Sequence, residues 1–208
     1  MDRSGALQIF GVDGIGEARA GESIARIIGA AIAEGPNGLE DGDVVVITHK
    51  IISKAEGRLV ELSTVEPSAL ARRFAETWGK DPRQVEVVLR ESKRVVRMER
   101  GILIAETRHG FICANAGVDA SNVDGREVVC LQPLDSDASA EAVRAHLGER
   151  FGVDVGVIVT DSFGRPWRAA TTDVAIGAAG VTVVRDLAGE LDPAGYELHA
   201  TRIAVGDE

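Results

Sequence analysis

The stretch VDVGVIVTDSFGRPWR, residues 153–168, is the segment from which the fold of this chain is most clearly predicted. Its first half is an apolar run that predicts a buried strand over residues 153–159, ending at Thr160, Asp161 and Ser162. A second run of β-branched residues, 44–48, follows the turn Asp41-Gly42-Asp43. We therefore expect two buried strands, one in each half of the chain.

Helical and strand-like segments alternate around these two runs. Apolar residues recur at helical spacing in residues 24–31, 70–78 and 140–147, with Asp135-Ser136-Asp137 as a cap, and Asp81-Pro82 is typical of a further helix start. Short strands are predicted at residues 7–10 and 59–62, and a hairpin at residues 102–105 and 111–113. Strands interleaved with helices, together with a hairpin, predict a mixed α/β or α+β fold in which mixed sheets are flanked by helices. With no visible boundary, residues 1–208 are expected to form one domain.

Composition excludes several classes of protein. The 208 residues are 45% hydrophobic and 27% charged, and charged residues interrupt every apolar run before the ~18–20 residues that a membrane-spanning helix needs. The first residues do not resemble a signal peptide, so we expect a cytoplasmic protein. An excess of 33 acidic over 23 basic residues gives a net charge of −10, which disfavours nucleic acid and membrane surfaces as partners. Locally concentrated cations and a divalent metal would still allow a small phosphorylated ligand to bind.

Several common sites are missing from the sequence. It has neither a P-loop motif nor a complete G-x-G-x-x-G pattern. The two cysteines, Cys113 and Cys130, lie far apart in apolar segments and are predicted to be buried thiols. None of the four histidines has metal-ligand spacing or belongs to a readable Ser-His-Asp arrangement.

Two polar segments leave both a binding and a structural interpretation open. The glycine-rich residues 11–17 lie between a predicted strand and a helix. Backbone N–H groups at such a position favour a phosphate, and the alternative is an ordinary tight turn. Lys50 and Lys54 lie four residues apart, so a helical turn would aim both ammonium groups to one side. They either attract phosphate or form a solvated pair balanced by Glu56.

A pair of carboxylates gives the strongest signal in the sequence. Asp119 and Asp161 each follow an apolar segment and are followed by hydroxyl or amide residues. Such groups are the hard oxygen ligands that Mg²⁺ and Mn²⁺ prefer, with water and phosphate in the remaining positions. The alternative is that each aspartate only caps a turn. Arg165-Pro166-Trp167-Arg168 offers guanidinium groups and an indole for a ligand clamp, or forms an ordinary surface segment.

Taken together, these segments resemble the coenzyme F420-0:L-glutamate ligase family over nearly the whole chain. The matching stretches are residues 14–17, 41–46, 48–58, 115–123, 160–168, 172–177 and 192–198. The resemblance implies an F420 gamma-glutamyl ligase-like fold, homodimerisation, and a GTP-dependent amide ligase whose substrates are GTP, coenzyme F420-0 and L-glutamate. In such an enzyme, GTP phosphorylates a carboxylate of the precursor, and the amine of glutamate displaces phosphate from the acyl phosphate. Further γ-linked glutamates are a natural extension of this reaction.

The resemblance also implies roles for individual residues. Ile15, Gly16, Glu17 and Ala18 would line the guanine nucleotide, His49 and Lys54 would lie beside it, and Asn122 would contact it. Asp119 and Asp161 would hold a first divalent ion, Mg²⁺ or Mn²⁺, and Ser162 a second one. Lys54 and Asp161 are the expected catalytic residues, since phosphoryl transfer depends on positioning and charge neutralisation. The sequence does not decide whether K⁺ also takes part.

Relatives in this family continue beyond the position of Glu208 into a helix and a glycine-containing phosphate loop, and we expect the 208 residues to lack these parts. Two alternatives follow. One is a shortened module that binds the nucleotide or the deazaflavin without turnover, and the other is a phosphoryl-transfer enzyme that acts on a different carboxylate.

Overall fold

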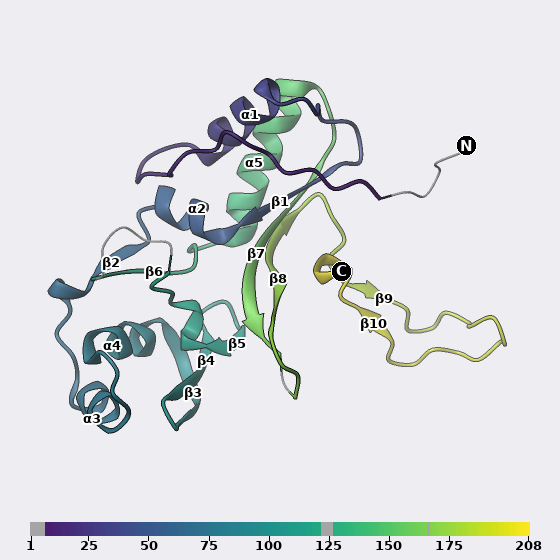
Figure 1. Cartoon of the computed structure of the whole chain (residues 1–208). Coiled ribbons are helices and arrows are strands. Elements are labelled where there is room, and N and C mark those ends of the chain that lie inside the picture. Colours follow the sequence, from purple (N-terminus) through teal and green to yellow (C-terminus); the bar gives the residue numbers. More distant parts are fainter. Residues whose placement is uncertain (1–6, 122–126, 166) are drawn as a thin grey trace.

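The computed structural model describes residues 7–121, 127–165 and 167–208 and contains helices and mixed sheets (Figure 1). The helices are α1 (Ile24–Glu34), α2 (His49–Ala55), α3 (Ala69–Trp78), α4 (Pro82–Glu91) and α5 (Ser136–Phe151). The strands are β1 (Val44–Thr48), β2 (Leu59–Glu61), β3 (Ser92–Glu99), β4 (Ile102–Thr107), β5 (Ile112–Ala114), β6 (Val128–Cys130), β7 (Gly156–Gly164), β8 (Thr171–Ala179), β9 (Arg185–Asp186) and β10 (Arg202–Ile203). The mixed α+β fold is thereby confirmed.

One layer consists of α1 and α5 packed against a three-stranded sheet of order β1-β7-β8 (Figure 1). β1 runs parallel to β7, and β8 runs antiparallel to it. Ile28 and Leu147 from the helices meet Val157 and Val159 of β7 in the core. The predicted strand at residues 44–48 is confirmed, but its burial is not, because β1 lies at the sheet edge and exposes Val46.

A second apolar core lies under α3 and α4. It joins these helices to the antiparallel sheet β3-β4-β5 and to the pair β2-β6. Ser68 and Asp81 cap the two helices, and the predicted β4-β5 hairpin is confirmed. The face expected for residues 70–78 is wrong in part, because Phe74 is buried whereas Leu70 and Trp78 are largely exposed. The buried stripe of α3 instead consists of Ala71, Phe74 and Ala75.

The strand predicted at residues 7–10 is wrong. This segment is extended but has no strand partner among the described residues, and Leu7 and Ile9 are about as exposed as in an unfolded chain, at 86% and 85%. Alternating apolar residues form a strand only where another strand completes their backbone hydrogen bonds. β9 and β10 form a separate arm that extends away from the body near the last residues of the chain (Figure 1). Within the described residues, none of the helices is long and apolar enough to cross a bilayer.

Candidate active site

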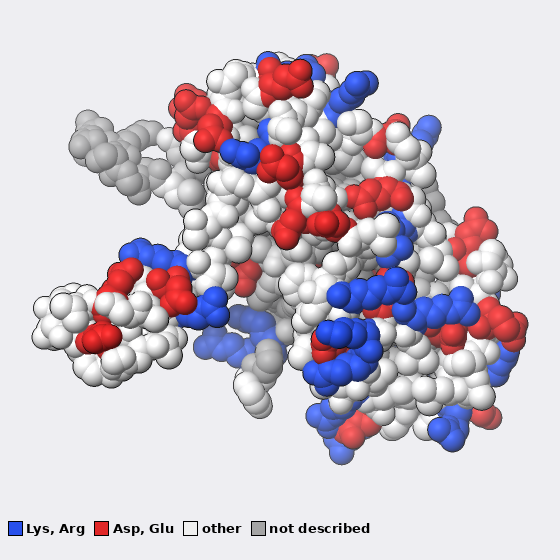
Figure 2. Space-filling view, turned by 180° about the vertical axis from the view of Figure 1, so that it is seen from behind, with Lys and Arg blue, Asp and Glu red and all other residues white. Residues whose placement is uncertain are grey.

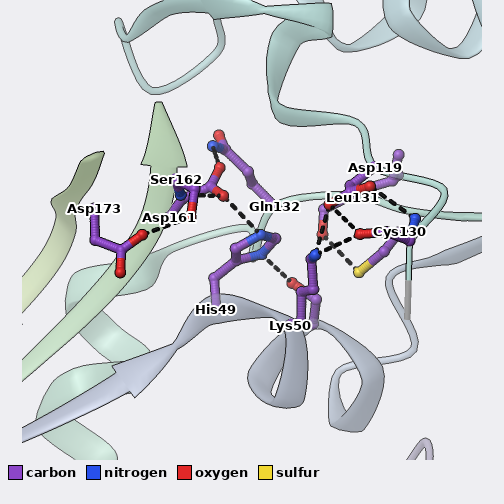
Figure 3. A network of polar contacts seen from close by, with 11 residues as sticks. His49, Lys50, Asp119, Cys130, Leu131, Gln132, Asp161, Ser162 and Asp173 are labelled. Atoms are coloured by element: carbon purple, nitrogen blue, oxygen red, sulfur yellow. Dashed lines mark hydrogen bonds and ion pairs between the residues drawn. The ribbon is translucent and has the colours of Figure 1, made fainter. Parts of the chain in front are cut away.

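The start of α2 lies between the two predicted metal-binding aspartates. β1 ends at Thr48, which is paired with Thr160 of β7, so the first residue of α2 reaches the neighbour of Thr160 in the sequence, Asp161. His49 faces Asp161, and the next residue, Lys50, forms an ion pair with Asp119 (Figure 3). Asp119 and Asp161, which lie 42 positions apart in the sequence, therefore contact neighbouring residues at the start of α2.

Asp161 is held by largely buried groups. The Nε2 atom of His49 lies 3.3 Å from Oδ1 of Asp161, and the His49 side chain is 1% exposed. The side-chain amide of Gln132 donates a hydrogen bond of 3.0 Å to Oδ2 of Asp161, and the N–H of Ser162 donates one of 2.8 Å to Oδ1. On the far side of the imidazole, Nδ1 contacts the hydroxyl of Ser53 at 3.2 Å. Asp161 is thus oriented by His49, Gln132 and the N–H of Ser162. Of these groups, only His49 can carry a positive charge, and it does so only when it is protonated.

The placement of Asp161 at a strand end is wrong. β7 continues to Gly164, past a register irregularity at Val159 and Thr160, and Asp161 is paired with Val174 of β8. The next residue, Ser162, donates a hydrogen bond of 2.5 Å to Oδ1 of Asp173 on β8 (Figure 3). The β7-β8 pairing thereby places a second carboxylate, that of Asp173, beside Asp161 and Ser162.

Asp119 has a more exposed and more strongly charged environment. Nζ of Lys50 lies 2.6 Å from its Oδ2, and the backbone and hydroxyl of Ser121 donate hydrogen bonds of 2.7 and 2.9 Å. The backbone of Asp119 exchanges two hydrogen bonds with Cys130 of β6. Asp119 therefore caps a turn, which was the structural alternative. This turn lies beside the ammonium group of Lys50 and next to β6, the strand that leads to Gln132.

The segment before Asp119 has an unusual backbone. Asn115, Ala116 and Gly117 have φ angles of 53°, 50° and 71°, in the left-handed region that residues other than glycine rarely adopt. A Cβ atom at Gly117 would lie 2.5 Å from the side chain of Gln132. Backbone strain of this kind is often found at functional sites. Here it brings the chain into close contact with the residue that orients Asp161.

Both aspartates favour the charged form. Burial works to raise the pKa of Asp161, but the neighbouring His49, the amide of Gln132 and the N–H of Ser162 outweigh it and leave the pKa below its ordinary value. At Asp119, burial again opposes ionisation, and the hydrogen bonds from Lys50 and Ser121 lower the pKa overall. Cys113 behaves oppositely, since burial and the charge of Asp161 raise the pKa of its thiol to about 11. Both cysteines are buried and unbridged, as predicted.

The predicted nucleotide segment lies against the other end of α2. Lys54, whose side chain is 9% exposed, pairs with Glu17, while Ala18 is buried and Ile15 packs against the core of the α1-α5 layer. Lys50 and Lys54, which were predicted to attract phosphate together, each have their own carboxylate partner, Asp119 and Glu17. The segment also does not lead directly into a helix, since α1 starts only at Ile24.

The remaining predicted residues contribute less to this site. Trp167 is fully exposed in the loop between β7 and β8, and Arg165 donates to the nearby carbonyl of Ala169. Asn122 and Pro166 lie outside the described residues. Among the residues that the structure describes, there is no cluster of three or more His, Cys, Asp or Glu side chains suited to bind a metal. Asp119 and Asp161, the two predicted carboxylate ligands, are therefore not part of a larger group of this kind among these residues.

Gln132 and Asp173 were not predicted as site residues. Gln132 lies in the segment Leu131-Gln132-Pro133, which has no recognisable motif, and its position depends on the long-range contact between β6 and Asp119. The buried Oε1 atom of Gln132 has no hydrogen-bond partner among the described residues, and the buried Nε2 atom of His49 faces Asp161 at 3.3 Å without forming a hydrogen bond. Buried polar atoms without partners are rare in folded proteins, which marks this corner as a place where a ligand is expected.

Comparisons with known proteins agree with the resemblance seen in the sequence. Residues 14–208 match the family described as F420-0:Gamma-glutamyl ligase. The protein named coenzyme F420:L-glutamate ligase from Methanopyrus kandleri is 50% identical over 189 residues, 91% of this chain and 73% of its own length. Its namesakes from Methanothermobacter thermautotrophicus and Haloarcula marismortui are 44% and 41% identical, with 97% of this chain covered in each case and 80% and 78% of their own lengths. The chain therefore belongs to the F420-0:gamma-glutamyl ligase family.

Proposed function

We propose that this protein is an amide ligase that joins L-glutamate to coenzyme F420-0 with GTP as the phosphoryl donor. A carboxylate oxygen of the acceptor attacks the γ-phosphorus of GTP and GDP leaves. The amine of glutamate then attacks the carbonyl carbon of the acyl phosphate, the C–O bond to phosphate breaks, and an amide forms with release of phosphate and a proton. The similarity to proteins named coenzyme F420:L-glutamate ligase supports L-glutamate as the added amine and an F420 compound as the acceptor.

The observation that carries the proposal is the pair of aspartates on either side of the α2 terminus (Figure 3). Phosphoryl transfer needs charge neutralisation and alignment more than it needs an acid or a base. Asp161, Ser162 and Asp119 offer oxygen atoms, and Lys50 and Lys54 offer cations within the same helix. This combination of groups is suited to a triphosphate with a divalent ion.

The donor set fits Mg²⁺ or Mn²⁺ in its chemistry. All three predicted ligands carry oxygen, the type of atom that these ions prefer, and Gln132 adds a buried amide oxygen without a partner among the described residues. A divalent ion bound by Asp119 and Asp161, with a second at Ser162, would neutralise charge on the transferring phosphate. Because Mg²⁺ usually keeps waters and phosphate oxygens as ligands, two carboxylates are a sufficient protein contribution.

The chain's own residues have separate tasks in this proposal. His49 and Gln132 fix the orientation of the Asp161 carboxylate, since both are almost fully buried. Lys54 exchanges Glu17 for the terminal phosphates, because a triphosphate carries more negative charge than one carboxylate. Ile15, Gly16 and Ala18 then provide the wall beside the base.

The test is release of phosphate from GTP that requires both F420-0 and L-glutamate, measured with Mg²⁺ or Mn²⁺ and with or without K⁺. Glutamate-dependent release supports the ligase. Nucleotide binding without release would instead favour the binding module, and release with another carboxylate alone would favour the third alternative.

We also infer a homodimer. Leu7, Ile9 and Phe10 lie on an extended segment without a covering element among the described residues, and Val46 of the edge strand β1 is 62% exposed. Exposed apolar side chains on an extended segment and on an edge strand are suited to contact with a second chain. Analytical ultracentrifugation should give twice the mass of one chain, and a monomer at micromolar concentration would contradict the inference.

A further inference from the structure

Basic side chains gather on the lobe formed by α3, α4, β3 and β4, although the chain as a whole has a net charge of −10 (Figure 2). We define the basic strip as six cations that belong to β3, its turn and two neighbouring loops: Arg58, Lys93, Arg94, Arg97, Arg100 and Arg108. β3 is an edge strand of the sheet β3-β4-β5, so its outer side faces no other described strand.

The ion pairs of the basic strip leave an excess of positive charge. Lys93 and Arg94 share Glu106, with N···O distances of 2.8 and 2.5 Å. Arg97 and Arg100 both pair with Glu99, and Arg58 and Arg108 both pair with Glu91. Six cations therefore face three carboxylates, and each carboxylate offsets only one of its two partners.

The basic strip begins next to the aspartate site. Nε of Arg58 donates to the carbonyl oxygen of Gln132 at 3.0 Å, and Nη2 donates to Glu91 at 2.9 Å. Gln132 is the same residue whose side-chain amide holds Asp161. A chain of direct contacts thus leads from Asp161 through Gln132, Arg58 and Glu91 to Arg108, whose side chain is 60% exposed. From Arg94 to Glu99, β3 extends the strip by about 16 Å at ~3.3 Å per residue, and Arg100 follows in the turn.

Resting on the proposed ligase function, we propose that the basic strip binds the oligo-γ-glutamyl tail of an acceptor that already carries glutamate. Each ligation consumes one carboxylate and adds the two of glutamate, so every cycle makes the acceptor more negative by one charge. A tail of this kind presents a row of carboxylates along an extended chain. The strip offers a row of incompletely paired guanidinium and ammonium groups that leads away from the reacting carboxylate, and such groups bind carboxylates well.

The distribution of charge argues against a purely protective role for these side chains. Charges on an edge strand prevent pairing with another chain, and either sign serves that purpose. Here the surplus on β3 is entirely positive in an acidic protein. Surface charges of one sign attract ligands of the opposite sign, and salt weakens the attraction beyond a Debye length of ~8 Å at physiological ionic strength.

The test compares the complete chain with the double variant Arg94→Gln/Arg97→Gln, whose replaced side chains are 58% and 63% exposed, so the fold should be retained. The matched control Arg26→Gln/Arg150→Gln removes the same charge from exposed positions on α1 and α5. Binding of the peptide tetra-γ-L-glutamate is measured by calorimetry at low and high salt. Product lengths from F420-0 are followed by mass spectrometry.

We expect the strip variant to bind the peptide roughly tenfold more weakly than the wild-type chain, an effect that salt removes, while the control variant binds normally. Addition of the first glutamate to F420-0 should stay within about twofold, and later additions should slow by about tenfold. Equal peptide affinity in the strip variant and the wild type would overturn the proposal, as would tighter binding of an oligonucleotide of equal charge. Because peptide binding requires no turnover, an inactive wild-type chain that binds the peptide would refute the ligase function and leave the strip intact.

Discussion

The two aspartates of the site differ in how their charge is compensated. Asp119 has a full positive charge, that of Lys50, 2.6 Å from its carboxylate, and its side chain is 38% exposed. Asp161 is 14% exposed and contacts a histidine, an amide and a backbone N–H. The uncompensated negative charge of the site therefore lies mainly at Asp161, and a divalent cation should depend on Asp161 more than on Asp119.

The largest effect is expected from Asp161→Asn, which keeps the shape of the side chain and removes this charge. Affinity for Mn²⁺ with GTP should fall by about 100-fold or more, or ~3 kcal/mol, as for a well-placed electrostatic contact. Isothermal titration gives the affinity. The control, Asp154→Asn, removes a carboxylate that is 81% exposed and should leave the affinity unchanged. An Asp161→Asn protein with normal affinity would remove Asp161 from the site.

A second experiment tests the close packing of Gly117 against Gln132, the residue whose amide contacts Asp161. Gly117→Ala places a Cβ atom 2.5 Å from the Gln132 side chain at a φ of +71°. Overpacking together with the backbone strain should lower the free energy of unfolding by ~3 kcal/mol, measured in urea. At Gly79, with a φ of +63° and no heavy atom within 4 Å of the added Cβ, the same change should cost only ~1 kcal/mol. Similar losses at both positions would show that contact with Gln132 is unimportant.

A third experiment tests whether Lys54, which pairs with Glu17, contacts the terminal phosphates of GTP. Lys54→Met should weaken GTP binding by about tenfold and GMP binding much less, because the ammonium group is expected to contact the terminal phosphates. Competition between the two nucleotides in one titration measures the difference. Equal losses would show that Lys54 acts only through Glu17 and the fold.

The smallest effect concerns pH. Both aspartates have a folded-state pKa below the ordinary value of 3.8, so their ionised forms stabilise the native state above about pH 4, and this contribution disappears as the pH falls through the lowered pKa values. The free energy of unfolding should therefore decrease between about pH 5 and pH 3. In Asp119→Asn this decrease should be smaller, by less than ~1 kcal/mol, because Asp119 is partly exposed. If Asp119→Asn and the wild type lost the same free energy of unfolding over this pH range, the ion pair between Asp119 and Lys50 would be contradicted.

The sequence predicted the helices of this fold better than its strands. The caps and apolar periods that specify α1, α3, α4 and α5 are local, and all four helices form where they were expected. The end of β7 was missed because Ser162, Phe163 and Gly164 are not distinctive, and their strand conformation depends on pairing with β8. Residues 7–10 have the composition of a strand, but the described chain supplies no partner for them.

The candidate site shows the same division. Asp119, Asp161 and Lys54 belong to recognisable motifs and were predicted, whereas the contact of His49 with Asp161 follows from the parallel pairing of β1 with β7. Gln132 reaches Asp161 because Asp119 pairs with Cys130, a contact between distant segments. Motifs thus identified the charged groups, and only the tertiary structure identified the neutral residues that orient them.

The account rests on Asp119 and Asp161 sharing one divalent ion, which a double-mutant cycle of Mn²⁺ binding tests directly. Affinity is measured for the wild type, for Asp119→Asn, for Asp161→Asn and for the double variant. If both carboxylates hold the same ion, the second substitution should cost little once the first has been made, a clear departure from additivity. Independent, additive losses would show that the two aspartates bind separate ions and would contradict the shared site.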